Sequence, residues 1–182
     1  GNLPRIYRSI IGSLARTKMK AKWILVADGP EAVSVSVESD FRGESLEVER
    51  VIHGGGPCTY GIAQKNLGIG RIGDGFFYCL DDDNLVHPLF FTGLEWAVNT
   101  HSTKRAFVVG QQRWDSLGLL VASPDRMEYG QIDNTMFVVH ASLIGGARYD
   151  PAHSGREDFE FFRKLWDLHK DEFIFIGETL SY

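Results

Sequence analysis

Cysteine is rare in this 182-residue sequence, in which Cys58 and Cys79 are the two examples. Two thiols cannot form the disulfide framework of small secreted domains, so the fold must depend on an ordinary apolar core. Cys79 lies inside an apolar run, where a cysteine usually acts as a small buried hydrophobic residue. This usage fits a reducing compartment, and we therefore expect a cytoplasmic protein.

Long apolar runs and an excess of basic residues are also lacking. No stretch approaches the ~18 consecutive apolar residues that suggest a membrane span, so we predict no transmembrane segment. The net charge is −5, whereas a nucleic-acid-binding surface needs a basic face, and we expect no nucleic-acid partner. The sequence has no internal repeat and no low-complexity segment, and its length suits one domain, residues 1–182.

Apolar strands alternate with amphipathic helices along the chain. The expected strands cover residues 23–27, 45–50, 76–80, 106–110 and 173–176. The expected helices cover residues 3–14, 60–67, 89–99 and 156–168. Such alternation predicts an α/β fold with a mostly parallel central sheet flanked by helices. Residues 111–130 have no clear period and predict a long loop, and the apolar segment 135–140 is of undecided type.

The most informative stretch is the apolar run 76–80, which leads directly into Asp81, Asp82 and Asp83. A continuous apolar run suits a strand buried on both faces, and open α/β sheets bind ligands at the carboxyl ends of their strands. Adjacent carboxylates repel one another, which favours a divalent cation with an attached phosphate as their partner. The alternative is an acidic turn, because Asp and Asn commonly form turns.

Three other segments bear on a ligand site. Asp28 follows the strand at 23–27 and either forms an Asp-Gly turn or approaches a ligand across neighbouring strand ends. The glycine-rich segment 54–57 predicts a loop, but no Gly-Lys-Ser or Gly-x-Gly-x-x-Gly pattern follows it, which disfavours a phosphate cradle. Glu157 and Asp158 open the last helix, where acidic residues favour the helix dipole even without a functional role.

Three motifs occur in an order that resembles the GT-A fold glycosyltransferases, most closely the inverting enzymes of family 2. Lys65-Asn66-Leu67-Gly68 resembles the basic-Asn-x-Gly segment of that family. Residues 78–83 resemble the apolar strand that ends in the Asp-x-Asp signature, and residues 155–159 resemble the Glu-Asp motif of a late helix. A single Asp-x-Asp motif is weak evidence for this family, but its combination with a Glu-Asp helix start about 75 residues later is stronger evidence. The resemblance covers nearly the whole chain.

The resemblance implies a nucleotide-diphospho-sugar donor and a metal ion. Asp83 would bind Mn²⁺ or Mg²⁺ directly, with Asp81 at the ribose or at the water shell of the metal. Asp28 would hydrogen-bond the base or ribose, and Lys65 would contact the nucleotide. Asp82 belongs to the same nucleotide-sugar-binding stretch, although its side chain is expected to face away. Hard oxygen ligands of this kind suit Mn²⁺ and Mg²⁺.

The resemblance also implies an acceptor side and a catalytic base. Residues 1–110 would form the donor-binding half of a Rossmann-like GT-A domain, and residues 111–182 the acceptor-binding half. An inverting transfer needs a base that faces the acceptor hydroxyl, and by resemblance this is Asp158, with Glu157 as the second choice. The acceptor could be a carbohydrate, a lipid-linked molecule or another hydroxyl compound. Three residues would line its side of the site: Ile132, Asp133 and Asn134.

Two departures from the family and two rival functions remain. The family's first strand is missing before the helix at 3–14, and the region after Ile176, which often adds donor contacts, is short. A haloacid-dehalogenase-like phosphatase also has Asp-x-Asp after an apolar strand, but there a Gly-Thr or similar pair usually follows, where this chain has Asn84-Leu85. Its later Gly-Asp-x-x-x-Asp motif is not found. A non-catalytic α/β module that binds a nucleotide or sugar is the second rival.

Overall fold

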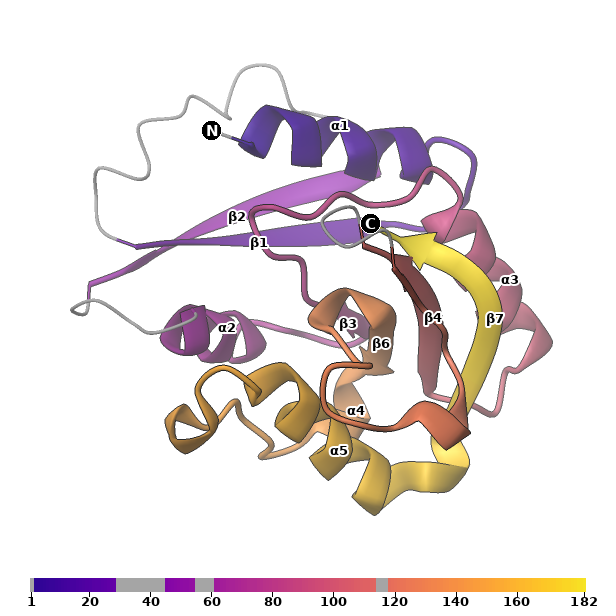
Figure 1. Ribbon diagram of the computed structural model, residues 1–182. Coiled ribbons are helices and arrows are strands. Elements are labelled where there is room, and N and C mark those ends of the chain that lie inside the picture. Colours follow the sequence, from indigo (N-terminus) through magenta and orange to yellow (C-terminus); the bar gives the residue numbers. More distant parts are fainter. Residues whose placement is uncertain (1, 29–44, 55–60, 114–117) are drawn as a thin grey trace.

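The computed structural model describes residues 2–28, 45–54, 61–113 and 118–182 (Figure 1). Its strands are β1 (Ala21–Asp28), β2 (Leu46–His53), β3 (Phe76–Tyr78), β4 (Ala106–Gln112), β5 (Leu119–Leu120), β6 (Phe137–His140) and β7 (Phe173–Ser181). Its α-helices are α1 (Leu3–Leu14), α2 (Ile62–Ile69), α3 (Phe90–Thr100), α4 (Ala141–Ile144) and α5 (Glu157–His169). The expected α/β class is confirmed.

Five of the strands form one mixed sheet, in the order β3, β6, β4, β5, with β7 also paired to β4. β3 and β4 both run antiparallel to β6, so they point in the same direction with β6 between them. β7 is parallel to β4, and β5 is antiparallel to it. The expectation of a mostly parallel sheet is therefore wrong. In the described chain between β4 and β6 no helix is long enough for a parallel crossover, so β6 returns antiparallel along β4.

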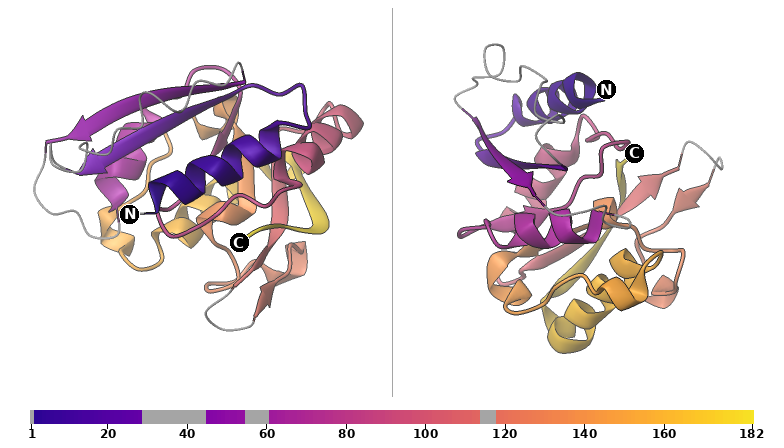
Figure 2. Two further views of the ribbon diagram at one scale, coloured as in Figure 1. Left: turned by 90° about the horizontal axis from the view of Figure 1, so that it is seen from above. Right: turned by 90° about the vertical axis from the view of Figure 1, so that its left-hand side faces the viewer.

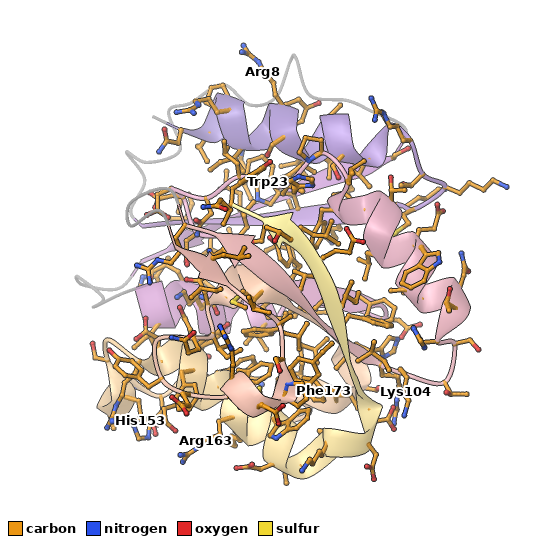
Figure 3. All side chains as sticks on the ribbon, turned by 45° about the vertical axis from the view of Figure 1, so that its right-hand side comes forward. Arg8, Trp23, Lys104, His153, Arg163 and Phe173 are labelled. Carbon is orange, nitrogen blue, oxygen red and sulfur yellow. The ribbon has the colours of Figure 1, made fainter. Side chains whose placement is uncertain are left out.

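The five-stranded sheet is buried on both faces along β4. Along β4, Ala106 and Val108 belong to one core cluster, and Phe107 and Val109 belong to the other. α4 and α5 contribute to the first cluster, and α1 and α3 contribute to the second (Figures 1 and 2). Figure 3 shows Phe173 beside α5, on the face of the sheet that the first cluster covers. A strand buried on both sides has a continuous apolar sequence, and the strand expected at 106–110 is confirmed.

β1 and β2 form a separate parallel sheet, in which Trp23 lies opposite Val48. α1 lies on one side of this sheet and α2 on the other (Figure 1 and the right view of Figure 2). α2 packs closely on β1, because a Cβ added to Gly68 would lie 3.6 Å from Cγ2 of Val26. The half-exposed strand expected at 45–50 is confirmed, with β2 extending as far as His53.

Several expected elements differ in length. β3 is only three residues long, half-buried, and within the described chain it pairs only with β6, so it is not a strand buried on both faces. The pairing of β3 with β6 ends at Tyr78, because its partner Val138 is already close to the first residue of β6. The expected loop 111–130 contains the end of β4 and all of β5, with residues 114–117 outside the described part. Segment 135–140 combines a short 3-10 helix with β6.

Gly54 ends the described part before residues 55–60, so the predicted glycine-rich loop at 54–57 and Cys58 lie largely outside it. β7 continues to Ser181, beyond the strand expected at 173–176. Among the described helices, none combines the length and the apolar character that a bilayer crossing requires.

Candidate active site

Segments far apart in the sequence bring four charged side chains to one point, which we call the Lys65 cluster: Lys65, Asp81, Glu157 and Asp158. Nζ of Lys65 lies 2.9 Å from Oδ1 of Asp158 and 3.5 Å from Oδ1 of Asp81. Oε1 of Glu157 lies 3.7 Å from the same nitrogen. The lysine comes from α2, Asp81 follows β3, and the other two carboxylates open α5. One cation thus contacts carboxylates from two of the sequence motifs.

Burial sets the charge behaviour of this cluster. The Lys65 side chain is only 9% exposed, and that of Asp158 is 22% exposed. Burial disfavours the charged amine, but the carboxylates of Asp81 and Asp158 outweigh this effect and raise the pKa of Lys65. Burial raises the pKa of Asp158 to about 6, against the attraction of Lys65, which lowers it. At neutral pH the Asp158 carboxylate is therefore mainly ionised and is more basic than an ordinary aspartate.

Asn66 fixes the chain that leads to α5. Its Nδ2 donates a hydrogen bond of 2.8 Å to the carbonyl oxygen of Tyr149, and its Oδ1 accepts one of 2.9 Å from the Tyr149 backbone N–H. Lys65 and Asn66 are adjacent on α2, so one residue contacts Asp158 while the next holds the segment before it. Together with the close packing of Gly68 on β1, these contacts give the Lys65-Asn66-Leu67-Gly68 motif a structural meaning.

The turn before α5 separates the roles of Glu157 and Asp158. Gly155 has a φ of +87°, a left-handed conformation that favours glycine. Its N–H donates a hydrogen bond of 2.7 Å to Oε2 of Glu157, whose side chain is only 6% exposed. Glu157 therefore caps the turn from inside the protein. Both residues line a pocket, but the Asp158 side chain is 22% exposed, which makes it the more accessible of the two carboxylates.

A buried hydrogen-bond network supports Asp81 from the other side. The Tyr149 hydroxyl donates to Oδ1 of Asn134 over 2.7 Å, and Nδ2 of Asn134 donates to Oδ2 of Asp81 over 3.5 Å. Both Tyr149 and Asn134 are fully buried. The Tyr149 ring stacks on Phe161 at 4.2 Å and lies 5.4 Å from Nζ of Lys65. Burial raises the pKa of Asp81, while Lys65 opposes this shift.

A pocket with a volume of about 290 Å³ lies next to Asp158. Two of the three predicted acceptor residues, Ile132 and Asp133, line it, whereas Asn134 points into the buried network instead. Oδ1 of Asp133 accepts hydrogen bonds from the backbone N–H and the hydroxyl of Thr135, at 2.9 and 2.8 Å. The pocket is lined by Arg113, Leu120, Tyr129, Gly130, Ile132, Asp133, Gly155, Arg156, Glu157, Asp158 and Phe159.

The other predicted donor residues are less organised. Asp82 and Asp83 are exposed at the turn after β3. Asp28 ends β1, where its backbone lies opposite His53, and its side chain is outside the described part. The nucleotide contact implied for Lys65 stays a prediction, because its ammonium group contacts protein carboxylates here.

The donor chemistry of the acidic turn fits Mn²⁺ or Mg²⁺. Burial is the main cause of the raised pKa of Asp81, and repulsion from Asp83 adds a smaller contribution. The two carboxylates are therefore near enough to interact. Mg²⁺ commonly uses one or two carboxylates together with waters and substrate phosphates. Within the described residues, no three His, Cys, Asp or Glu side chains gather into a ready-made metal site. Two carboxylates suffice only if a substrate supplies the remaining ligands.

Sequence reasoning missed Tyr149 and Tyr129, which both take part in the candidate site. Tyr149 joins Asn66, Asn134 and Lys65, and its partners come from distant segments. Tyr129 lines the pocket beside Asp158. No local spacing marks either residue, because each contact depends on how separate segments meet. An aromatic residue between the Gly145-Gly146 break and the late helix is the one weak signal for Tyr149.

No protein-family model and no curated protein sequence matches this chain. Its fold does match solved structures, which show a glycosyltransferase-like mixed α/β fold. The likeness is in the fold alone, because the sequence identities are 12% and 13%.

Crystal structures of S. aureus TarS, a glycosyltransferase, are among the matching structures. TarS 1–349 matches with a TM-score of 0.72 and 13% identity, and the match covers 100% of this chain and 57% of that one. A longer TarS structure matches with a TM-score of 0.72 and 12% identity, with 34% of its chain covered. TarS 1–349 in complex with UDP matches with a TM-score of 0.72 and 12% identity, and the match covers 57% of that chain. The chain thus spans little more than half of TarS 1–349.

Proposed function

We propose that the protein is a metal-dependent, inverting glycosyltransferase of the family 2 type. It would move a sugar from a nucleotide-diphospho-sugar to the hydroxyl group of an acceptor. The observation that carries this proposal is the contact between Lys65 and Asp158 over 2.9 Å, next to Asp81 and beside a pocket. A glycosyltransferase-like fold gives this arrangement its context, and the UDP complex of TarS favours a nucleotide-sugar donor.

The donor would lie at the acidic turn after β3. Departure of a nucleoside diphosphate leaves negative charge on the oxygen that separates from the anomeric carbon. A Mn²⁺ or Mg²⁺ ion held by Asp83, with Asp81 beside it, would supply Lewis-acid neutralisation of that charge. Asp81 is held in place for this task by Lys65 and Asn134. Asp28 would contact the base or ribose.

The acceptor would enter the pocket beside Asp158. As its oxygen forms a bond to the anomeric carbon, the bond from that carbon to the diphosphate breaks, and the acceptor proton passes to the Asp158 carboxylate. A base works best when its pKa is close to the working pH, and burial raises the pKa of Asp158 to about 6. Lys65 keeps the carboxylate ionised before the reaction and fixes its orientation.

Asp158 is a better candidate for the base than Glu157. The Glu157 side chain is 6% exposed, and one of its oxygens accepts the Gly155 N–H. To reach an acceptor, Glu157 would have to break this bond and leave the turn that it caps. Both residues line the pocket, but the Asp158 side chain is more exposed, at 22%. A mutant in which Asp158 is replaced therefore tests the assignment more directly than one in which Glu157 is replaced.

The proposal is tested by titrating UDP, GDP and dTDP into the protein by calorimetry, with and without Mn²⁺. We expect one nucleotide to bind and its affinity to rise when Mn²⁺ is present. Release of the nucleoside diphosphate from a panel of nucleotide sugars then separates catalysis from binding alone. Failure of all three nucleotides to bind would contradict the proposal. Hydrolysis of a generic aryl phosphate would favour the phosphatase alternative.

A further inference from the structure

We propose that Tyr129 forms a stacking platform for a sugar ring, so that the acceptor is a saccharide that presents its hydroxyl group to Asp158. This inference rests on the proposed function and specifies the acceptor that the same site uses. It depends on the way in which Tyr129 is held, on the lining of the pocket and on the pocket's size.

Tyr129 is an exposed aromatic residue whose orientation is nevertheless fixed. Tyr129 is 62% exposed, and its hydroxyl donates a hydrogen bond of 3.1 Å to the Gly155 carbonyl oxygen. Its ring meets that of Phe159 edge to face, with the centroids 6.3 Å apart. The next residue, Gly130, turns the chain with a φ of +82°. An aromatic ring that is anchored at both ends and uncovered by protein is ready to receive a flat partner.

The contacts that hold Tyr129 tie it to the turn that carries the base. Gly155 accepts the tyrosine hydroxyl and donates its own N–H to Glu157. Phe159 directly follows Asp158 at the start of α5. Tyr129 and Asp158 both line the same pocket. A ligand that stacks on the Tyr129 ring from inside this pocket therefore lies in a space that Asp158 borders.

The lining of this pocket matches the surface of a sugar ring. A pyranose has an apolar face of C–H groups, which suits an aromatic ring, and a rim of hydroxyl groups, which needs hydrogen-bonding partners. The pocket supplies apolar surface from Tyr129, Phe159 and Ile132, and polar groups from Asp133 and Arg156. Binding sites for small molecules commonly combine such apolar walls with a few polar groups.

The size and polarity of the pocket argue against other acceptors. Its volume is about 290 Å³, close to the lower limit of roughly 300 Å³ for small-molecule sites, which suits a compact group. A lipid chain needs an extended apolar groove, and the polar lining of this pocket does not provide one. A peptide typically binds along a sheet edge or in a long groove, whereas this pocket lies between a turn and the start of α5.

The test measures binding of methyl glycosides of glucose, galactose, mannose and N-acetylglucosamine by saturation-transfer NMR. Wild-type protein is compared with Tyr129→Ala, Tyr129→Phe and Tyr129→Trp, and Trp96→Ala serves as a control because Trp96 is an exposed aromatic on α3. Geranyl phosphate and a Ser/Thr-containing peptide are tested in parallel. UDP affinity is measured on every sample by calorimetry, and GDP and dTDP are titrated into the wild-type protein.

We expect at least one glycoside to bind wild-type protein and Tyr129→Ala to weaken this binding about tenfold, the effect of losing a stacked ring. Tyr129→Phe, Tyr129→Trp and Trp96→Ala should retain the binding, and UDP affinity should be unchanged in all variants. The proposal is overturned if no glycoside binds, if Tyr129→Ala binds the glycoside as well as wild type does, or if geranyl phosphate or the peptide binds in place of a glycoside.

The UDP measurement distinguishes the two proposals. UDP binding without glycoside binding overturns the saccharide platform and leaves the transferase function standing. Glycoside binding that depends on Tyr129, without binding of any nucleoside diphosphate, supports the platform and contradicts the transferase function.

Discussion

Asp158 and Asp83 are the two carboxylates assigned to the chemistry, and they lie in opposite surroundings. Asp158 is largely buried, paired with Lys65 at 2.9 Å and placed at the start of a helix. Asp83 is exposed at a turn that follows a strand of three residues. The proposed base is thus held by protein contacts, whereas the turn proposed to bind a metal ion would need a ligand to complete the site.

This difference predicts that the Lys65 cluster contributes more to the stability of the fold than the acidic turn does. The Lys65 cluster holds one buried cation among three carboxylates, of which Glu157 is buried and Asp81 and Asp158 are partly exposed, so each charge depends on the others. The acidic turn exposes its charges to solvent, where their repulsion is screened. We therefore expect substitutions in the cluster to change both stability and activity, and substitutions at Asp83 to change ligand binding alone.

The largest effect is expected for Asp158→Asn. An amide cannot accept the acceptor proton, and loss of a general base typically lowers the rate about a hundred- to ten-thousand-fold. Nucleotide binding in the presence of Mn²⁺ should persist, because the donor side is unchanged. Initial rates of nucleoside-diphosphate release and calorimetric UDP titrations measure the two effects.

Glu157→Gln is the matched control for this substitution, because glutamine can still accept the Gly155 N–H. It should retain much more activity than Asp158→Asn. In wild-type enzyme, kcat/KM should fall as the pH is lowered through about 6, since protonated Asp158 cannot act as a base. Normal turnover by Asp158→Asn, or an acid limb that is unchanged in that variant, would remove Asp158 from this role.

Lys65→Met should cause the largest loss of stability. Removal of the cation leaves Asp81, Glu157 and Asp158 without their shared partner. Removing one member of a buried ion pair costs 3–5 kcal/mol, and because two of these carboxylates are partly exposed we expect about 3 kcal/mol in the free energy of unfolding. Urea denaturation measures this change.

Lys22→Met provides the control, since Lys22 also contacts two carboxylates, those of Glu47 and Glu49, but at the exposed surface. It should have little effect on stability. The deficit of Lys65→Met should shrink as the pH falls, because acids whose pKa is raised in the folded state destabilise it when ionised. Equal losses for the two lysine variants would show that burial of the cluster has no special importance.

A smaller and more selective effect is expected for Asp83→Asn. Loss of a direct ligand should weaken the Mn²⁺-dependent part of UDP binding by at least about tenfold, the lower range for disturbed metal sites. Because Asp83 is exposed, the free energy of unfolding should stay within about 0.5 kcal/mol of the wild-type value. Asp82→Asn, at the neighbouring exposed position, should leave both quantities unchanged. If Asp82→Asn has the larger effect on UDP binding, the two assignments must be exchanged.

The sequence allowed the helices and the convergence of Lys65, Asp81 and Asp158 to be predicted in part. Helical periodicity marks residues 3–14 and 156–168 clearly, and α1 and α5 follow these limits closely. The convergence was implied by the resemblance to the glycosyltransferases, whose motifs place acidic residues after an apolar strand and at the start of a late helix. Both positions are typical of residues at one edge of an α/β sheet.

The pairing of the strands could not be predicted in the same way. An apolar run shows that a strand is buried, but it does not identify its neighbours or their direction. β6 lies antiparallel between β3 and β4, and β3 is shorter than its apolar sequence suggests. The contacts of Tyr149 with Asn66 and Asn134 join residues far apart in the chain, so no local pattern announces them.

The two hydrogen bonds between the Asn66 amide and the Tyr149 backbone have one further consequence. They join α2 to the segment that leads to α5, because Lys65 directly precedes Asn66 and the chain from Tyr149 continues to Asp158. A displacement of α2 would then carry both charges together. Movements of the exposed residues Asp82 and Asp83 would reach this pair of charges through Asp81, which contacts Lys65.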